Sequence, residues 1–233
     1  MTQLVEIDSG DPDIGQVNRP LYSTDDRTIH VEPDGEGTLQ ALQKQLPLFL
    51  FHDWIVQVPN GDYLGEGPAI HLGPVMVKGH AELKIAGNVN NREQVFVDAG
   101  INLSAYGKVE KIRVRGLDLH GLTQVDGMAW FTETNLRGNE TCGLDGKGGW
   151  VQTHDCHIGG PQAEHAVYPN ALQRLALRTS QLEADDTAIA GPIGSEVSLD
   201  RCQLVGDSPR LSNHHRRAID GVYRGGRRVA FDD

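Results

Sequence analysis

The sequence predicts an all-β fold, a parallel β-helix whose successive coils stack on one another. The segment KIRVRGLDLHG (111–121) has apolar residues at alternate positions on each side of a single break, and it ends with a glycine. Four later segments share this pattern, so that the repeats begin at Ile112, Ala129, Val151, Leu175 and Val197. Self-similarity at a step of about 20–25 residues is typical of a solenoid, in which each repeat buries its apolar face against the next.

The spacing within each repeat indicates strands. Apolar residues at every second position point to one face of a strand, and the break in the alternation fits a corner between two short strands. No repeat contains a helical pattern of about ten residues, which argues against leucine-rich and helical arrays. We therefore expect like positions of successive repeats to stack in columns about 4.8 Å apart.

Length and composition agree with this prediction. The 233 residues suffice for one long domain or two small ones. Glycine is frequent, at 28 residues, and aromatic residues make up 6%, which suits a narrow core with glycine at the corners. We expect no membrane insertion, because no apolar run reaches about 18 residues. The first residues lack a basic region followed by an apolar one, so we expect no secretory signal.

The charge is acidic and unevenly distributed. The net charge is −11, and the 21 basic residues are mostly arginine. This balance argues against nucleic-acid binding, which needs a basic face. It is typical of halophilic proteins, although an ordinary acidic surface accounts for it equally well. Residues 1–60 carry a net charge of −7 and residues 201–233 a net charge of +3, an asymmetry that can pair one end with another surface.

The chain divides into three parts. Residues 1–35 are expected to form an extended arm for assembly or anchoring, in which only LVEI (4–7) and TIHVE (28–32) are strand-like. Residues 36–207 form the β-helix. Residues 208–233 form an Arg-rich tail or a closing hairpin with Gly225-Gly226 at its turn.

A short α-helix is predicted just before the first coil. Thr38 suits an N-cap, and Leu39, Leu42 and Leu46 share one helical face. Pro47 ends the pattern. Such a helix would cover the open end of the β-helix, where strand edges and apolar core would otherwise be exposed.

Residues 34–121 resemble pectin-lyase-like β-helix proteins of phages and prophages. The resemblance rests on TLQALQKQLPLFLFHDWIVQVPNGDY (38–63), whose V-x-x-G-x-Y turn spans Val58 to Tyr63, and it continues in VMVKGHAELKIAGN (75–88) and KIRVRGLDLHG. It implies a right-handed parallel β-helix in a virion, as a tail, fibre or surface-spike component that is commonly a homotrimer or another ring. Members of this family range from polysaccharide-cleaving enzymes to inert structural proteins, so the resemblance implies no particular activity.

The repeat also predicts the state of the cysteines. Cys156 and Cys202 occupy one inward column with Ser180 between them. Two coils amount to about 9.6 Å, beyond the reach of roughly 7 Å for a disulfide, so both thiols should be free and buried. GNETCGLDGKGGW (138–150), which holds Cys142, is predicted to be a loop between coils. It lacks the spacing of a phosphate-binding loop.

Two carboxylates form the strongest catalytic candidate. Glu133 and Asp155 fall in the corner column, about 4.8 Å apart, which is close to the spacing of a retaining glycosidase pair. We favour a solvated corner, in which Arg178 and Arg201 offset these charges. His154 and His157 with Asp155 suggest a metal, but the two histidines fall on different walls. We therefore expect no metal and no cofactor.

The outward columns supply candidate ligand-binding residues. Asp118, Asn135 and His157 share one column, and Arg178 lies close in sequence to its later members. The candidate oligomer contacts are Arg216, Arg217, Arg227 and Arg228, which we expect to dock on a neighbouring subunit's acidic arm.

The predicted function is that of a non-enzymatic virion structural protein. It would be synthesised in the host cytoplasm and function in the extracellular particle. Its partners would be further copies of itself, other virion proteins and host cell-surface carbohydrate, with no nucleic acid. The alternative is a polysaccharide depolymerase, a lyase or glycoside hydrolase, that uses Glu133 and Asp155. A cellular carbohydrate-active protein is a third possibility.

Overall fold

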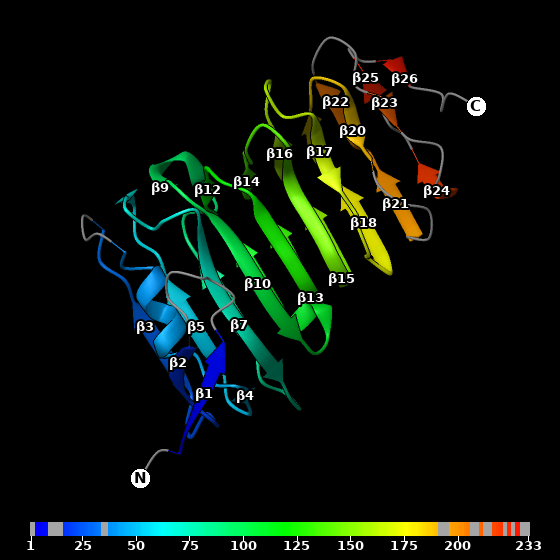
Figure 1. The fold of residues 1–233 in the computed structure, drawn as a ribbon. Coiled ribbons are helices and arrows are strands. Elements are labelled where there is room, and N and C mark those ends of the chain that lie inside the picture. Colours follow the sequence, from blue (N-terminus) through cyan, green and yellow to red (C-terminus); the bar gives the residue numbers. More distant parts are fainter. Residues whose placement is uncertain are drawn as a thin grey trace.

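The computed structural model describes residues 3–8, 16–33, 37–190, 196–205, 210–211, 216–220, 223–224 and 227–228. These residues are mostly β-strands, arranged in a large and a small sheet whose strands run almost entirely parallel (Figure 1). Strands β1 (Leu4–Asp8) and β2 (Gln16–Pro20) form a separate antiparallel pair. The described part of the chain contains three short 3₁₀ helices and no α-helix.

The large sheet takes the longer strands. Its first strands are β3 (Arg27–His30), β4 (Phe49–Leu50), β5 (Trp54–Gln57), β7 (Ala69–Val77), β8 (Leu83–Ala86), β10 (Gly100–Tyr106) and β11 (Ile112–Arg115). It continues with β13 (Thr123–Thr132), β15 (Cys142–His154), β17 (His165–Tyr168), β18 (Arg174–Arg178), β20 (Thr187–Ile189), β21 (Glu196–Asp200), β23 (Arg210–Leu211) and β24 (Arg216–Asp220).

The small sheet takes one short strand from each repeat. Its strands are β6 (Gly61–Tyr63), β9 (Val95–Val97), β12 (Asp118–Leu119), β14 (Asn135–Leu136), β16 (His157–Gly159), β19 (Gln181–Glu183), β22 (Gln203–Val205), β25 (Tyr223–Arg224) and β26 (Arg227–Arg228). Strands β25 and β26 pair antiparallel, and all the other pairs in this sheet are parallel. The turn predicted at Gly225-Gly226 lies outside the described residues.

Like positions of the repeats stack in register, as the sequence predicted. In the large sheet, paired neighbours form one inward file of Val114, Phe131, Thr153, Leu177 and Leu199. In the small sheet the inward file is Leu119, Leu136, Ile158, Leu182 and Leu204. Each of these side chains is at most 2% exposed. Full burial of one such aliphatic or aromatic side chain stabilises the fold by roughly 1.5–3 kcal/mol, so these files form the core.

The predicted corners adopt a left-handed backbone. Glu133, Asp155, Thr179 and Arg201 have φ between 45° and 53°, and Gly116 in the same column has φ 67°. The corner N–H groups of Glu133, Asp155 and Thr179 each donate to a carbonyl of the next repeat, at 2.8 to 3.1 Å. These hydrogen bonds offset a conformation that costs an L-residue with a side chain roughly 1–2 kcal/mol.

A second bend lies within the longest strands. The register between β13 and β15 shifts between Val125 and Asp126, where Gly127 and Gly149 have φ of 112° and 74°. A bulge of this kind bends a strand and increases its twist. Accordingly, the first half of β13 pairs with β10 and its second half with β11. Strand β15 likewise pairs with β17 before its bulge and with β18 after it.

The predicted α-helix at residues 38–47 is wrong. The structure has instead a 3₁₀ helix, η1 (Gln40–Lys44), with no side-chain cap at its N-terminus. The carboxylate of Glu66, distant in sequence, accepts the backbone N–H groups of Leu39 and Gln40 at 2.9 and 2.7 Å. The apolar face was predicted correctly, because Leu39, Leu42 and Leu46 are at most 3% exposed. The other 3₁₀ helices are η2 (Arg92–Gln94) and η3 (Val109–Lys111).

The first residues are tied to the large sheet. Strand β3 pairs in parallel with β5, and the side chain of Arg19 is fully buried. Its guanidinium donates to the carbonyl oxygens of Leu46, Pro47 and Gly73. Burial lowers the pKa of Arg19 to about 10. Three backbone acceptors thus hold the guanidinium inside the molecule.

Two predictions about cysteine have different outcomes. Cys156 and Cys202 are free and at most 1% exposed, as predicted. Residues 138–150 are not the predicted loop, because β15 begins at Cys142 and makes this thiol 5% exposed. Glycine allows this strand to lie close to its neighbours, since a Cβ on Gly146 would approach Leu172 to 2.2 Å.

No helix in the described residues is long and apolar enough to cross a membrane.

Candidate functional site

The structure aligns three of the four predicted ligand-binding residues. Asp118, Asn135 and His157 are successive partners on β12, β14 and β16, and the file continues to Gln181 and Gln203. Arg178 is exposed and pairs with His154 and Asp200 in the large sheet, so it lies outside this file.

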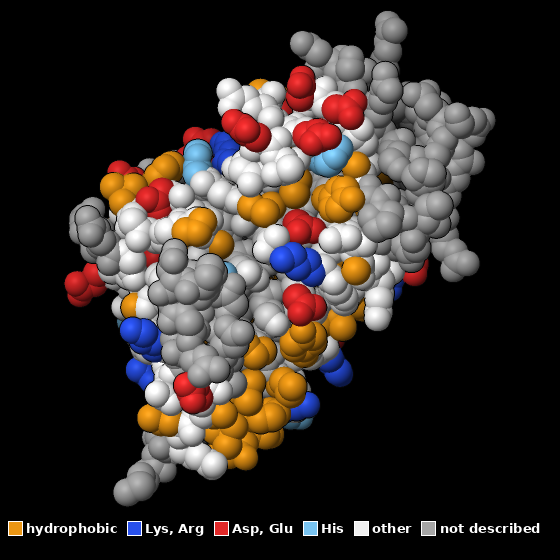
Figure 2. All heavy atoms as spheres, in the orientation of Figure 1, with side chains coloured by type: hydrophobic (Ala, Val, Ile, Leu, Met, Phe, Trp, Pro, Cys, Tyr) orange, Lys and Arg blue, Asp and Glu red, His pale blue; other side chains and the backbone are white. Residues whose placement is uncertain are grey.

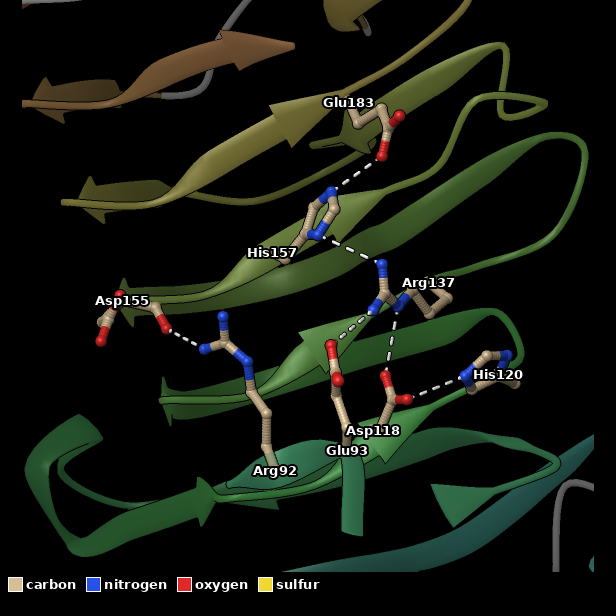
Figure 3. Close-up of polar contacts among 8 residues, drawn as sticks. All are labelled: Arg92, Glu93, Asp118, His120, Arg137, Asp155, His157 and Glu183. Atoms are coloured by element: carbon tan, nitrogen blue, oxygen red, sulfur yellow. Dashed lines mark hydrogen bonds and ion pairs between the residues drawn. The ribbon is translucent and has the colours of Figure 1, made fainter. Parts of the chain in front are cut away.

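Asp118 is the acid of this file, and it is buried. Its side chain is 8% exposed, and its carboxylate accepts hydrogen bonds from Arg137 Nε at 3.2 Å and His120 Nε2 at 3.0 Å (Figure 3). Burial by itself raises the pKa of Asp118. Hydrogen bonds from His120 and Asn135 and the charges of His120 and Arg137 outweigh this effect, so the pKa lies below its ordinary value. Asp118 is therefore a charged anchor for Arg137 and is poorly suited to act as a proton donor.

Arg137 extends the network to the next strands. Its Nη1 lies 3.2 Å from His157 Nδ1, and His157 Nε2 lies 2.9 Å from Glu183 Oε2. Because a guanidinium can only donate, Nδ1 accepts and the neutral imidazole donates from Nε2. Burial and the charge of Arg137 lower the pKa of His157, and Glu183 opposes them. We call the chain of His120, Asp118, Arg137, His157 and Glu183 the polar ladder.

A groove opens beside the polar ladder. It has a volume of about 690 Å³ and lies between segments 137–141 and 160–163, with His120 at its wall. Arg137 belongs to both the ladder and the groove. Asn139 Oδ1 accepts hydrogen bonds from the Thr141 N–H and hydroxyl and from the Cys142 N–H, at 2.8 to 3.1 Å, and fixes the rim. The volume lies within the range of about 300–1,000 Å³ that is typical of ligand sites.

The predicted catalytic pair lines a smaller hollow. Glu133 and Asp155 both border a space of about 280 Å³, together with residues 89–93. Arg92 Nη1 donates to the backbone carbonyl of Asp155 at 2.5 Å, while the Asp155 carboxylate points to the other side (Figure 3). The structure therefore brings the two acids to one hollow, next to a guanidinium bound to backbone.

Two further carboxylates on the outer face of the large sheet, Asp145 and Asp126, were not predicted from the sequence. Asp145 Oδ2 accepts a hydrogen bond from Gln124 Nε2 at 3.1 Å, whereas its Oδ1 is buried without a partner. Burial raises the pKa of Asp145. One strand away, Asp126 Oδ2 accepts the Tyr106 hydroxyl at 2.7 Å. The alternation of Cys142 and Leu144 with Asp145 was the available signal, but the surrounding glycines concealed it.

The remaining predicted groups are separated or lie outside the description. His154 belongs to β15 and His157 to β16, in different sheets. Among the described residues, no group of three or more His, Cys, Asp or Glu is arranged to hold a metal ion. Arg216 begins β24, and Arg227 and Arg228 form β26. The side chains of these arginines, and of Arg217, lie outside the described part of the chain.

Comparison with known proteins identifies no relative. No protein-family model matches the chain, and no curated protein or solved structure is similar to it. The function is therefore inferred from the residues and their geometry.

Proposed function

We propose that the chain is a right-handed parallel β-helix that serves as a non-enzymatic structural protein of a virion, oligomerises, and binds host-surface glycans in the groove beside the polar ladder. The observation that carries the glycan part is the groove itself, which Arg137 and His120 of the polar ladder line. Its lining includes the polar side chains of His120, Asn139, Glu140 and Gln162. Hydroxyl-rich sugars offer both donors and acceptors to such groups.

The register of the strands supports the helical winding. Each repeat adds a strand to the large sheet and one to the small sheet, and the chain passes between them at a left-handed corner. The bulge in the long strands supplies another bend within a repeat. Three walls joined by bends close a coil. A parallel crossover of this kind is right-handed in about 98% of cases, which favours a right-handed helix.

The polar ladder favours binding over catalysis. Asp118 is held charged, and His157 is held neutral between Arg137 and Glu183. Neither group is free to exchange protons with a substrate, since each engages the others of the ladder. A rigid wall of this kind suits recognition, because little side-chain entropy is lost when a ligand binds.

The virion assignment rests on the resemblance of residues 34–121 to phage and prophage β-helix proteins. Other virion proteins and further copies of the chain are the partners that it suggests. The uneven charge of the two ends supports contacts between copies.

A glycan-binding measurement tests the proposal. Wild-type protein should bind one or more oligosaccharides of a bacterial and archaeal surface-glycan array, and Glu140→Ala and Gln162→Ala should each weaken binding at least about tenfold, equivalent to about 1.4 kcal/mol. Gln203→Ala is the matched control, because Gln203 is exposed on the small sheet and does not line the groove. Unchanged affinity in both groove variants, with saturable binding by the wild type, would refute the site.

Depolymerisation is a second candidate, favoured by the raised pKa of Asp145. A carboxylic acid that keeps its proton longer suits the general-acid role in glycoside hydrolysis, and Asp126 on the neighbouring strand provides a second carboxylate. Reducing-sugar release from a bound polysaccharide would support this candidate. Loss of release in Asp145→Asn would place it on the large sheet, and loss in Glu133→Gln or Asp155→Asn would place it at the corner column.

A further inference from the structure

An exposed aromatic row lies at the end of the molecule that holds the first strands. Tyr22, Phe49, Met76 and Tyr106 are successive partners on adjacent strands, and Phe51 lies beside them. The Tyr22 and Phe49 rings stack with centroids 5.8 Å apart. Tyr22, Phe51 and Tyr106 are 45%, 53% and 39% exposed. Figure 2 shows hydrophobic side chains gathered at this end, below the grey residues.

Acidic side chains adjoin the aromatic row. Ser23 Oγ accepts the backbone N–H groups of Phe51 and His52 at 2.8 and 3.1 Å, and so holds segment 22–26 against segment 49–53. Segment 22–26 carries Asp25 and Asp26, and the Asp26 side chain is 78% exposed. The surface therefore combines flat apolar rings with negative charge.

The strands at the opposite end of the molecule have a basic sequence. Strands β24, β25 and β26 contain Arg216, Arg217, Arg224, Arg227 and Arg228 against the single acid Asp220. These strands lie at the other ends of the two sheets from β3 and β6 (Figure 1). In the small sheet, seven strand spacings separate β6 from β25, or about 34 Å. The basic strands thus lie far from the aromatic row of their own chain.

We propose that strands β24–β26 of a second copy dock on the aromatic row and its flanking aspartates, so that the subunits associate head to tail. Guanidinium groups stack on aromatic faces and pair with carboxylates, and this surface offers both. The chain already uses such stacking, with Arg27, Arg113 and Arg174 placed 4.5 to 5.2 Å from the centroids of tryptophan rings. A head-to-tail contact uses two different surfaces and builds a ring or a filament.

This inference deepens the oligomeric part of the proposed function and is independent of the glycan-binding part. It requires each subunit to carry one acceptor surface and one basic surface. Two variants that disable one surface each should therefore complement one another. A two-fold symmetric interface, in which one patch contacts itself, would not behave in this way.

Sedimentation velocity on the full chain provides the test. The wild type should form species larger than a monomer of 25.4 kDa. Tyr22→Ser with Phe51→Ser should disable the acceptor surface, and Arg227→Ser with Arg228→Ser should disable the basic surface, so that each double variant alone sediments as a monomer. An equimolar mixture should form a heterodimer of twice the monomer mass and nothing larger. Circular dichroism melting confirms that both variants are folded, and Leu64→Ser, which alters another exposed apolar side chain, should assemble like the wild type.

Three results would overturn the proposal: a monomeric wild type, assembly of the acceptor variant like the wild type, or a mixture of monomeric variants that stays monomeric. If the wild type is monomeric and the Tyr22→Ser with Phe51→Ser variant no longer binds glycan, the aromatic row would instead be a carbohydrate-binding surface. Retained glycan binding in the groove, together with a monomeric wild type, would leave the proposed ligand site intact and remove only this interface.

Discussion

The corners between the two sheets and the bulges within the long strands both bend the chain, but with different residues. Both have left-handed backbone, but the corners after Gly116 hold Glu133, Asp155, Thr179 and Arg201, whereas the bulges hold Gly73, Gly127 and Gly149. A Cβ on Gly127 would lie 2.0 Å from the Ala105 carbonyl oxygen, and one on Gly149 would lie 1.8 Å from the Gly127 oxygen. At the bulges the neighbouring backbone leaves no space for a side chain, whereas the corners from Glu133 to Arg201 accommodate one.

This difference matters for the interpretation of Glu133 and Asp155. Backbone strain often marks a functional site, and these two acids are strained. Thr179 and Arg201, however, share their φ and their place in the repeat. The left-handed geometry is therefore shared by all the corners from Gly116 to Arg201 and gives no support to catalysis at two of them.

The bulge should give the largest effect. Gly127→Ala should lower the free energy of unfolding by about 3–4 kcal/mol, because it adds a clash with backbone to an unfavourable φ. The matched control is Gly79→Ala, at φ 60° with no atom within 4 Å of the added Cβ, which should cost only about 1 kcal/mol. Chemical denaturation measures both values. Equal costs would mean that crowding at the bulge contributes nothing.

The second largest loss of stability is expected in the polar ladder. Arg137→Ala should lower the free energy of unfolding by about 1–3 kcal/mol, since it removes the guanidinium from Asp118, whose side chain is 8% exposed. Arg115→Ala, at an exposed arginine of strand β11 in the large sheet, should change it by less than about 0.5 kcal/mol. If the two variants proved equally stable, the ladder would be an exposed set of weak ion pairs.

A corner variant should be stabilised. Thr179→Gly should raise the free energy of unfolding by about 1 kcal/mol, because it relieves a φ of 45° and removes a buried hydroxyl that has no hydrogen-bond partner. Thr187→Gly, within β20, is the control and should destabilise by about 0.5–1 kcal/mol. Destabilisation by Thr179→Gly would show that the corner depends on its side chain.

The smallest expected effect is the change in the free energy of unfolding with pH, which should come from the polar ladder and not from the corners. In the folded protein the pKa of His157 lies below its ordinary value of 6.5, and that of Asp118 lies below 3.8. The unfolded chain therefore binds more protons in each window, so the free energy of unfolding should fall as the pH drops through about 6.5 and again below about 4. Asp145, whose pKa is raised, contributes with the opposite sign.

A variant isolates the contribution of His157. His157→Gln keeps an acceptor for Arg137 and a donor for Glu183 but does not titrate. Its loss of stability between about pH 7.5 and pH 5 should be smaller than that of the wild type, whereas Thr179→Gly should keep the wild-type slope. An unchanged slope in His157→Gln would remove His157 as the titrating group.

The sequence was sufficient for the stacked positions and for the corners. Alternation assigns each strand residue to one face, so Phe131 and Leu177 could be placed in one inward file and Glu133 and Asp155 in one corner column. Both the inward file and the corner column follow from the repeat alone, because parallel repeats put like positions side by side.

What the sequence could not supply depends on contacts between distant segments. The first helical turn is capped by Glu66 from elsewhere in the chain, so local capping rules predicted the wrong helix at Thr38. Glycines made the start of β15 resemble a loop, although close packing on its neighbours requires them. Arg137 joins three strands of the polar ladder, and its partners are apparent only once the strands are in register.

The central claim is that successive repeats stack one above another with like positions adjacent. Gln181 and Gln203 are exposed partners on β19 and β22, and parallel neighbours about 4.8 Å apart lie within disulfide range. Gln181→Cys with Gln203→Cys should form an intramolecular disulfide under mild oxidation, detected by intact-mass analysis and non-reducing electrophoresis. Gln181→Cys with Val205→Cys, displaced by two residues from that register, should remain reduced. Cross-linking of the displaced pair, with the paired positions unlinked, would contradict the stacking.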